Sequence, residues 1–315
     1  GVAMGRRGTD VAKEASRLIL LDDSFPTLVN AIEEGRTIFA NLKKTIYASL
    51  TTNIAELTLV LFGIVGVALW NYPIPILAVQ ILGIDLLGQI MPITFLTFDP
   101  PSKDIMNKPP RDPEKHILNR WVSTEFIFLG VLIGGLAFIN FLLFIQREGI
   151  TNFTKDITEH LDTIAFSHPE YLQVAALSYA TIVFCQYVNI LQRRYHKKTI
   201  FNKNIFSNKI LIGSIIGSIA LVIIAIYAPF ISDFFLFGPL KITDWGFVLL
   251  AALIYLFAFE ILKLRFVSIS FATTLVATSN CSGILISSLP IITVIVASYV
   301  PSGKLLPLAV ISTSC

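Results

Sequence analysis

The sequence predicts a mainly α-helical, polytopic membrane protein: a transmembrane bundle of about six helices, with a short α/β segment at the N-terminus. Hydrophobic residues make up 54% of the 315 residues and charged residues only 14%, whereas soluble domains carry about 25% charged residues. The mean hydropathy is +0.73. Apolar stretches of about 20 residues, the length that a helix needs to cross a bilayer, recur along the chain.

Charge and cysteine content exclude two classes of function. The formal net charge of +3 is too small to indicate a nucleic-acid partner. Cys185, Cys281 and Cys315 have neither a metal-ligand spacing nor the even number of a secreted disulfide framework. We therefore interpret them as small apolar residues.

Residues 1–45 are polar and mixed, as in a soluble segment. "GVAMG" and "LILL" (Leu18 to Leu21) resemble short buried strands, and Thr9 or Asp10 can cap a helix between them. Alternating strand and helix suggest an α/β layer. The chain starts with Gly1 and shows no charged region followed by a short apolar core. We therefore expect no signal peptide and a start within a domain.

A second helix is expected to continue from this segment into the membrane. Ser24 can cap it, and Pro26 lies in its first turn, where a missing N–H costs little. Gly35 weakens this helix without ending it. A helix from Thr27 to about Leu69 would be roughly 60 Å long, so it would couple the soluble segment to the bilayer.

The predicted spans alternate with loops of unequal charge. We place the spans at 46–69, 74–97, 121–146, 171–191, 210–230 and 246–264. Loop 98–120 and segment 193–203 each hold five Lys or Arg residues, whereas loops 148–170 and 231–245 hold one each. The positive-inside rule therefore places the N-terminal segment and both basic loops in the cytoplasm. The transmembrane region is predicted over 46–265.

The tail 266–315 differs from the rest of the chain. It is rich in Ser, Thr, Val and Ile, and Lys304 is its only charge. An apolar stretch near 284–300 is interrupted by Pro290. The tail can be read as an extra span, a re-entrant piece or a non-native extension such as a shifted reading frame. We favour the last interpretation and base no function on this segment.

Polar residues interrupt the first two predicted spans. Asn53 and Glu56 are three residues apart and share one helix face. In the second span, Asp85 and Gln89 lie about one turn apart. Gly83, Gly88 and Pro92 bracket the second pair. Glycine and proline loosen a helix and free backbone carbonyls, which a membrane protein tolerates where they line a cavity.

These side chains predict an ion pathway. Two carboxylates, two amides and freed carbonyls at similar depth suit a hard cation, with Glu56 and Asp85 as metal ligands. The alternative is that both carboxyl groups are protonated and hydrogen-bonded within the bundle. We favour the pathway because a charged group at mid-membrane costs about 2.5–3.5 kcal/mol on insertion scales and is functional by default. In the fourth span, Gln186 and Asn189 can add neutral ligands or simply join helices.

Several stretches resemble the type II P-type cation-transporting ATPases, the group that includes the calcium and sodium/potassium pumps. "GVAMGRRGTDVAKEASRLILLDDSFPTLVNAIEEGRTIFANLKKTI" is similar to the end of their phosphorylation domain and its stalk. "TTNIAE", "QILGIDLL" and "DPPSKDIMNKPPR" resemble their fifth helix, sixth helix and the following cytosolic loop. The similarity covers Gly1 to about Arg265 and implies the last part of the phosphorylation domain plus membrane helices five to ten.

The resemblance places Asn53, Glu56 and Asp85 on cation-binding positions of the family. It makes the helix from Pro26, with Gly35 and Arg36, the element that couples phosphorylation to the site. The chain departs from calcium pumps at three positions: Gly88 and Gln89 replace a threonine and an aspartate, and Val183 replaces a glutamate. These losses make a two-calcium site doubtful, and a single divalent ion, a monovalent ion or a proton is expected instead.

The family's DKTGT, TGE, PEGL and GDGxND motifs are absent from the 315 residues. The resemblance therefore implies that ATP and Mg²⁺ act only in the full-length pump, and that the missing N-terminal domains and membrane lipid are partners. Two other functions remain open. One is a stand-alone passive channel or carrier, although no inverted repeat is visible. The other is a remnant without catalysis.

Overall fold

The computed structural model describes residues 1–70, 72–102, 104–107, 109–110, 117–118, 120–148, 169–195, 200 and 207–281. The chain divides into two compact units, residues 1–261 and 262–315. The fold described below is that of the first unit, apart from residues 262–281, which end its last helix. Within the described residues, six helices are long and apolar enough to cross a membrane. The expected multi-pass helical membrane protein is confirmed.

The N-terminal segment forms the expected strand, helix and strand. β1 (Val2–Met4) and β2 (Leu18–Leu20) pair in parallel, with Val2 opposite Leu18. α1 (Asp10–Ala15) connects them, and the hydroxyl of Thr9 accepts a hydrogen bond from the N–H of Ala12 at its start. Parallel strands need such a crossover, so this short layer is a βαβ unit.

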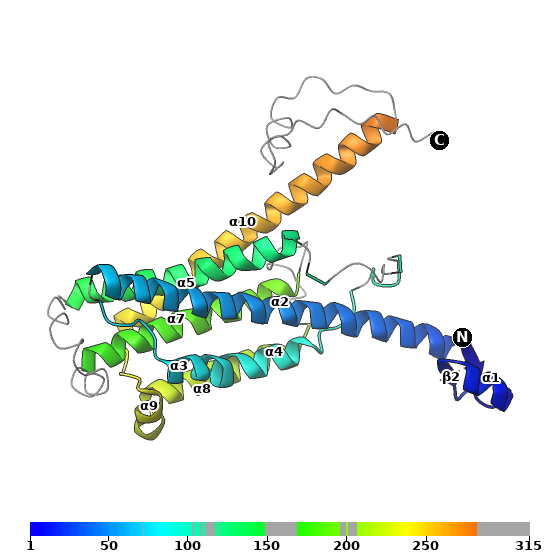
Figure 1. The fold of residues 1–315 in the computed structure, drawn as a ribbon, viewed down its shortest axis with the longest axis horizontal. Coiled ribbons are helices and arrows are strands. Elements are labelled where there is room, and N and C mark those ends of the chain that lie inside the picture. Colours follow the sequence, from blue (N-terminus) through cyan, green and yellow to red (C-terminus); the bar gives the residue numbers. More distant parts are fainter. Residues whose placement is uncertain are drawn as a thin grey trace. The chain divides into compact units, whose positions relative to one another are not determined.

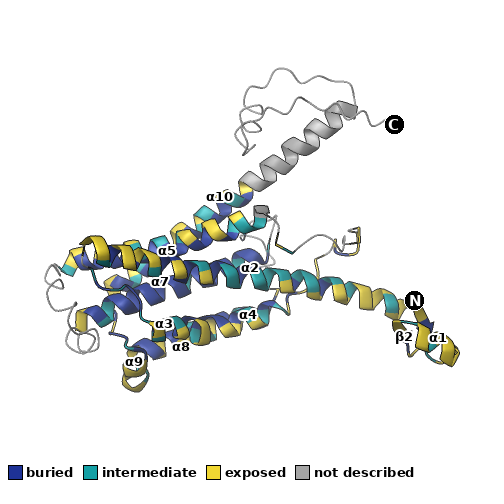
Figure 2. Cartoon of the chain, viewed as in Figure 1, coloured by how far each residue is buried: buried dark blue, intermediate teal, exposed yellow. Residues whose placement is uncertain are grey.

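The stalk and the first span are one continuous helix, α2 (Phe25–Trp70), of 46 residues. Pro26 occupies its second position, and the helix passes through Gly35 without interruption. Figure 1 shows α2 extending from the β1–β2 segment through the length of the bundle. Its first half is largely exposed, whereas from about Tyr47 onward one face of the helix is buried and the other stays exposed (Figure 2). The predicted helical connection into the membrane is therefore confirmed.

The second span contains a widened turn at the predicted break. α3 (Ala78–Gly83) is followed by the π-helical segment η1 (Ile84–Gln89) and by α4 (Ile90–Leu96). In a π-helix each carbonyl bonds the N–H five residues along, as the carbonyl oxygen of Asp85 does with the N–H of Ile90. Pro92 of α4 has no N–H to offer to the carbonyls of this turn. Such single turns are frequent at functional sites, and this one carries Asp85 and Gln89.

The remaining elements complete the bundle. They are α5 (Arg120–Glu148), α7 (Pro169–Arg193), α8 (Lys209–Tyr227), α9 (Pro229–Phe235) and α10 (Ile242–Cys281). α7 is the central helix, because 83% of its most apolar window is buried against 39–50% for the other spans. α10 extends beyond the predicted boundary at 265, and the stretch 284–300 lies outside the described residues.

Small residues allow α5 to pack closely against α2. A Cβ atom built on Gly130 would come within 2.6 Å of Ile54, and one built on Gly134 within 2.5 Å of the Ala55 carbonyl oxygen. Both glycines are therefore needed for the observed approach of the two backbones. This packing fixes the face of α2 on which Ala55 lies and turns the opposite face toward the second span.

Candidate functional site

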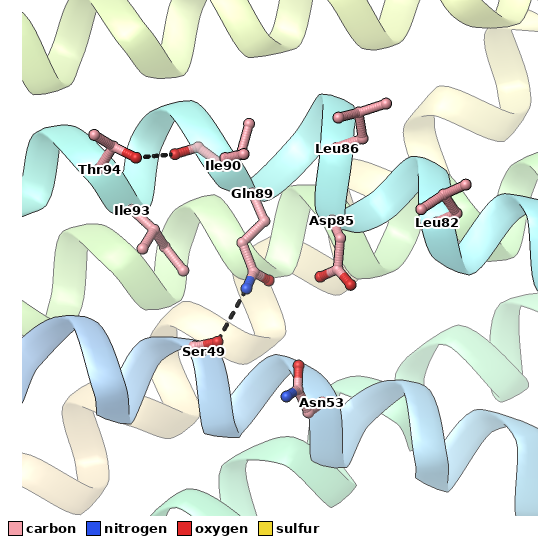
Figure 3. A pocket seen from close by; sticks show the side chains of 9 residues that line it. All are labelled: Ser49, Asn53, Leu82, Asp85, Leu86, Gln89, Ile90, Ile93 and Thr94. Atoms are coloured by element: carbon pink, nitrogen blue, oxygen red, sulfur yellow. Dashed lines mark hydrogen bonds between the residues drawn. The ribbon is translucent and has the colours of Figure 1, made fainter.

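Figure 3 shows a pocket of about 410 Å³ between α2 and the widened turn of the second span. The side chains of Asn53 and Asp85 point toward one another across it (Figure 3). The lining residues are Ser49, Asn53, Leu82, Asp85, Leu86, Gln89, Ile90, Ile93 and Thr94. Asn53 and Asp85 are both exposed, so the polar side of the pocket is open at the surface of this chain.

Glu56 lies one turn beyond Asn53 on α2 and is buried, with only 8% of its surface exposed. Its Oε1 atom has no hydrogen-bond partner among the described residues. Buried polar atoms are nearly always hydrogen-bonded, so an unpartnered carboxylate oxygen in the bundle is an open position for a ligand.

A chain of hydrogen bonds fills the neighbouring part of the site. The Nε2 atom of Gln89 donates to the hydroxyl of Ser49 at 3.1 Å, and its Oε1 accepts from Nε2 of Gln186. Gln186 is fully buried, and its own Oε1 has no hydrogen-bond partner among the described residues. The structure therefore brings Gln89 and Gln186 together, as one neutral chain that spans three helices.

An apolar contact lies beside the Ser49–Gln89–Gln186 hydrogen bonds, at Gly88, between Asp85 and Gln89 in sequence. A Cβ atom built on Gly88 would lie 3.1 Å from both methyl carbons of Val183. Val183 is completely buried in the centre of α7. The valine side chain occupies the space beside Gly88, so this contact offers no side-chain oxygen between η1 and α7.

Asn189 joins helices and offers no free ligand atom in this arrangement. Its Nδ2 donates to the carbonyl oxygen of Ala48 at 3.3 Å. Its Oδ1 accepts from the hydroxyl of Tyr255 at 3.1 Å and from Nε of Arg193 at 3.3 Å. The sequence allowed both Gln186 and Asn189 as neutral ligands. In the structure both amide atoms of Asn189, Nδ2 and Oδ1, are hydrogen-bonded, whereas Oε1 of Gln186 has no hydrogen-bond partner among the described residues.

Sequence reasoning missed the buried ion pairs beside these amides. Arg193, counted above as part of a basic loop, is 6% exposed and donates to Glu125 of α5 at 2.7 Å and to the hydroxyl of Thr51. Arg194 donates to Asp99, which also accepts from Lys44 of α2. Arg193 and Arg194 are adjacent in sequence, but only the fold shows which carboxylates they pair with.

The stalk contacts the loop that follows the second span. Nη1 of Arg36 donates to the carbonyl oxygens of Ile105 at 3.0 Å and Met106 at 3.4 Å. One turn further, Nδ2 of Asn41 donates to the carbonyl oxygens of Thr97 and Asp99. Gly35 faces open space, with no atom within 4 Å of a Cβ built on it. These contacts link α2 directly to the end of the second span.

No three side chains of His, Cys, Asp or Glu converge on one point within the described ranges. The candidate site in this chain therefore offers two carboxylates, Asp85 in the pocket and the buried Glu56, with the amide of Asn53 across from Asp85. Carboxylate and amide oxygens are ligands for hard cations, which require more of them than this set provides.

Comparisons with known proteins agree over most of the chain. Residues 73–265 match the family model described as cation transporting ATPase, C-terminus. The chain is 35% identical to calcium-transporting ATPase 1 of Bacillus cereus over 265 residues, which cover 84% of this chain and 29% of that protein. It is 33% identical to a calcium-transporting ATPase of Bacillus subtilis over 250 residues, or 79% of this chain and 25% of that protein.

A human relative, calcium-transporting ATPase type 2C member 1, is 32% identical over 249 residues, or 79% of this chain and 24% of that protein. The chain thus spans a quarter to somewhat under a third of the length of these relatives. The matched region, the helical bundle and the apolar spans all agree: the chain belongs to the cation-transporting ATPase family and carries its C-terminal membrane region.

Proposed function

We propose that this chain is the membrane portion of an ATP-driven cation pump and that Asn53, Glu56 and Asp85 bind the transported cation. The observation that carries the proposal is the unpartnered Oε1 of Glu56 in the bundle, close to the pocket where Asn53 and Asp85 face one another. A buried carboxylate without a hydrogen bond is costly, and a bound cation would supply the missing partner.

The site holds one cation in this proposal. Val183 fills the space beside Gly88, and Gln89 is bonded to both Ser49 and Gln186, so no second set of ligands forms there. The open Oε1 of Gln186 is a candidate neutral ligand, and Gln89 positions it. Two carboxylates balance a divalent charge. Because the relatives above are named calcium-transporting ATPases, we take Ca²⁺ as the cation to test first.

The exposed side chains of Asn53 and Asp85 must be shielded from lipid by other helices. Asn53 and Asp85 are exposed on a face with apolar neighbours such as Leu82 and Leu86. A carboxylate facing lipid costs about 2.5–3.5 kcal/mol on insertion scales. We propose that membrane helices of the N-terminal part of the pump cover this face and add ligands. ATP and Mg²⁺ would act in that part, outside this chain.

Coupling would run through α2. Pro26 starts the helix, Gly35 leaves one side of it open, and Arg36 holds the loop after the second span through the Ile105 and Met106 carbonyls. A helix is stiff along its axis, so displacement of the stalk would move α2 and this loop together. The same helix carries Asn53 and Glu56, so the displacement would reach the site.

The test is cation-stimulated phosphorylation of the purified full-length protein by ATP. Glu56→Gln and Asp85→Asn should each abolish the stimulation by Ca²⁺, because each removes a charged ligand. Glu34→Gln is the matched control, since Glu34 is an exposed carboxylate in the stalk part of the same helix and should leave stimulation unchanged. Unchanged Ca²⁺ dependence in Glu56→Gln would defeat the assignment. Ca²⁺ flux through the 315-residue chain in liposomes without ATP would favour a passive carrier.

A further inference from the structure

An aromatic cluster lies at the end of the bundle away from the stalk. It consists of Tyr179 of α7, Phe235 at the end of α9 and Phe237, each at most 5% exposed. The ring centres of Tyr179 and Phe237 are 4.5 Å apart, and those of Phe235 and Phe237 are 5.7 Å apart with nearly parallel planes. The cluster therefore joins α9 and the residues directly after it, 229–238 (the α9 region), to the central helix α7.

The aromatic cluster contacts the backbone that leads into the widened turn. A Cβ atom built on Gly83 would lie 3.1 Å from the Phe235 ring and 3.4 Å from the Tyr179 ring. The hydroxyl of Tyr179 donates to the carbonyl oxygen of Gly83 at 3.3 Å. Gly83 is the last residue of α3, and Asp85 follows two positions later. The last turn of α3 is thus held from two sides.

Gln80 fastens the same helix to the α9 region. It is fully buried, its Oε1 accepts from the N–H of Leu77 at 3.1 Å, and its Nε2 donates to the carbonyl oxygen of Leu236 at 3.0 Å. Leu236 lies between the two phenylalanines with φ 56° and ψ 49°. A leucine adopts this left-handed conformation only where its surroundings impose it.

Neighbouring backbone bonds impose that conformation. The N–H of Phe237 donates to the carbonyl oxygen of Ser232 at 2.9 Å, and the N–H of Gly238 donates to that of Leu172 at 3.0 Å. The Leu236 carbonyl oxygen, which accepts from Gln80, is therefore held in place by backbone bonds to α9 and to α7.

The opposite end of the widened turn is also fixed. Gln89, its last residue, is bonded to Ser49 of α2 and to Gln186 of α7. A π turn accommodates one more residue than an α turn, and a shift by one residue rotates a helix by about 100°. Were either end released, η1 could relax to α-helical register and turn Asp85 away from Asn53.

We propose that Gln80 is a positioning residue for Asp85: together with the aromatic cluster, it locks α3 and fixes the direction in which η1 presents Asp85. The lock itself follows from the contacts above, and its consequence for cation binding rests on the proposed function. Gln80 lines no part of the pocket and acts only through the backbone.

The first arm of the test measures amide hydrogen exchange over residues 78–90 in the full-length protein in lipid nanodiscs. Gln80→Met should speed exchange there about tenfold, and Tyr179→Phe, which removes one hydrogen bond, about threefold. Tyr187→Phe is the matched control, since it removes from the same helix a buried hydroxyl that makes no hydrogen bond to the second span among the described residues. Exchange in α5 should be unchanged in all three variants. Wild-type exchange over 78–90 in Gln80→Met would overturn the lock.

The second arm separates positioning from general support. In Ca²⁺-stimulated phosphorylation, Gln80→Met should raise the Ca²⁺ concentration for half-maximal stimulation by about fivefold or more, with the maximal level within about twofold of wild type. A lower maximal level at unchanged half-maximal Ca²⁺ would overturn the positioning role. If the wild type shows no stimulation while exchange still responds to Gln80→Met, the lock stands and the proposed function fails.

Discussion

Gly88 of η1 lies directly against Val183 of α7, so that a Cβ atom on the glycine would come within 3.1 Å of both valine methyl carbons. The resemblance to calcium pumps described above indicated a lost oxygen ligand at both of these positions. Gly88 has no side chain, and the methyl groups of Val183 occupy the space beside it. The two residues therefore form one packed contact, with little room for a Cβ atom at position 88.

Gly88→Ala should destabilise the protein through this contact. Overpacking a buried position costs about 1–3 kcal/mol, because the surrounding side chains must leave their rotamers. The measurement is thermal unfolding of the full-length protein in detergent. Val183→Ala should relieve the clash, so that the double variant is more stable than the sum of the two single changes predicts. Strictly additive effects would show that the two side chains do not meet.

Asp99→Asn should weaken the junction between the stalk helix and the bundle. Asp99 is 7% exposed and accepts from Lys44 at 2.8 Å and from Arg194 at 2.9 Å. Removing one partner of a buried ion pair typically costs about 3–5 kcal/mol, because the opposite charges stay buried. Thermal unfolding measures the effect. Asp104→Asn, an exposed carboxylate in the same loop, is the control and should change stability little. Equal effects of both variants would contradict the junction.

Asp244→Asn should loosen the contact between the end of α5 and the start of α10. Asp244 is fully buried, accepts from Nη2 of Arg147 at 2.6 Å, and also accepts from the N–H of Lys241. We expect a loss of about 3 kcal/mol, as for a buried pair. Glu148→Gln weakens the partly exposed pairs of Glu148 with Lys241 and Arg147 and should cost less than about 1 kcal/mol. The reverse order in denaturant unfolding would refute this ranking.

The turn before the stalk should loosen in acid. The hydroxyl of Thr27 and the N–H of Ser24 hold the pKa of Asp22 below its usual value, and the N–H groups of Arg6 and Arg7 do the same for Asp23. A lowered pKa in the folded state means that the stabilisation is present above the ordinary value of 3.8 and is lost as pH falls through the lowered one.

Amide exchange at Arg6, corrected for its intrinsic pH dependence, measures this loosening. Protection should persist at neutral pH and fall below the ordinary carboxyl pKa. In Asp23→Asn, the pH dependence at Arg6 should disappear. Protection at Arg6 that is lost only as pH rises would contradict the role of Asp23.

The sequence predicted the elements that depend on local chemistry. Thr9 caps α1, and α2 runs from the stalk into the bundle because no residue after Pro26 stops it. Glu56 and Asp85 were found because charge is rare in an apolar span, which makes such residues conspicuous. The same logic found Gln89 and Gln186, although not the bond between them.

The long-range features could not be predicted, because they depend on which faces meet. Arg193 and Arg194 are adjacent in sequence, yet they pair with Glu125 on α5 and with Asp99 after α4. The glycines at 83 and 88 predicted a weak helix, but not that it widens into a π turn with Tyr179 and Val183 packed against these two glycines. Nothing in the local sequence of Leu236 indicates its left-handed backbone, which the contacts of the α9 region impose.

The most direct test of the account is equilibrium binding of radioactive Ca²⁺ to the purified full-length protein, as wild type, Glu56→Gln and Asp85→Asn. We predict saturation at about one Ca²⁺ per protein for the wild type and loss of this binding in both variants, because each removes a charged oxygen ligand of a single site. Saturation at two Ca²⁺ per protein, or wild-type binding retained in both variants, would contradict it.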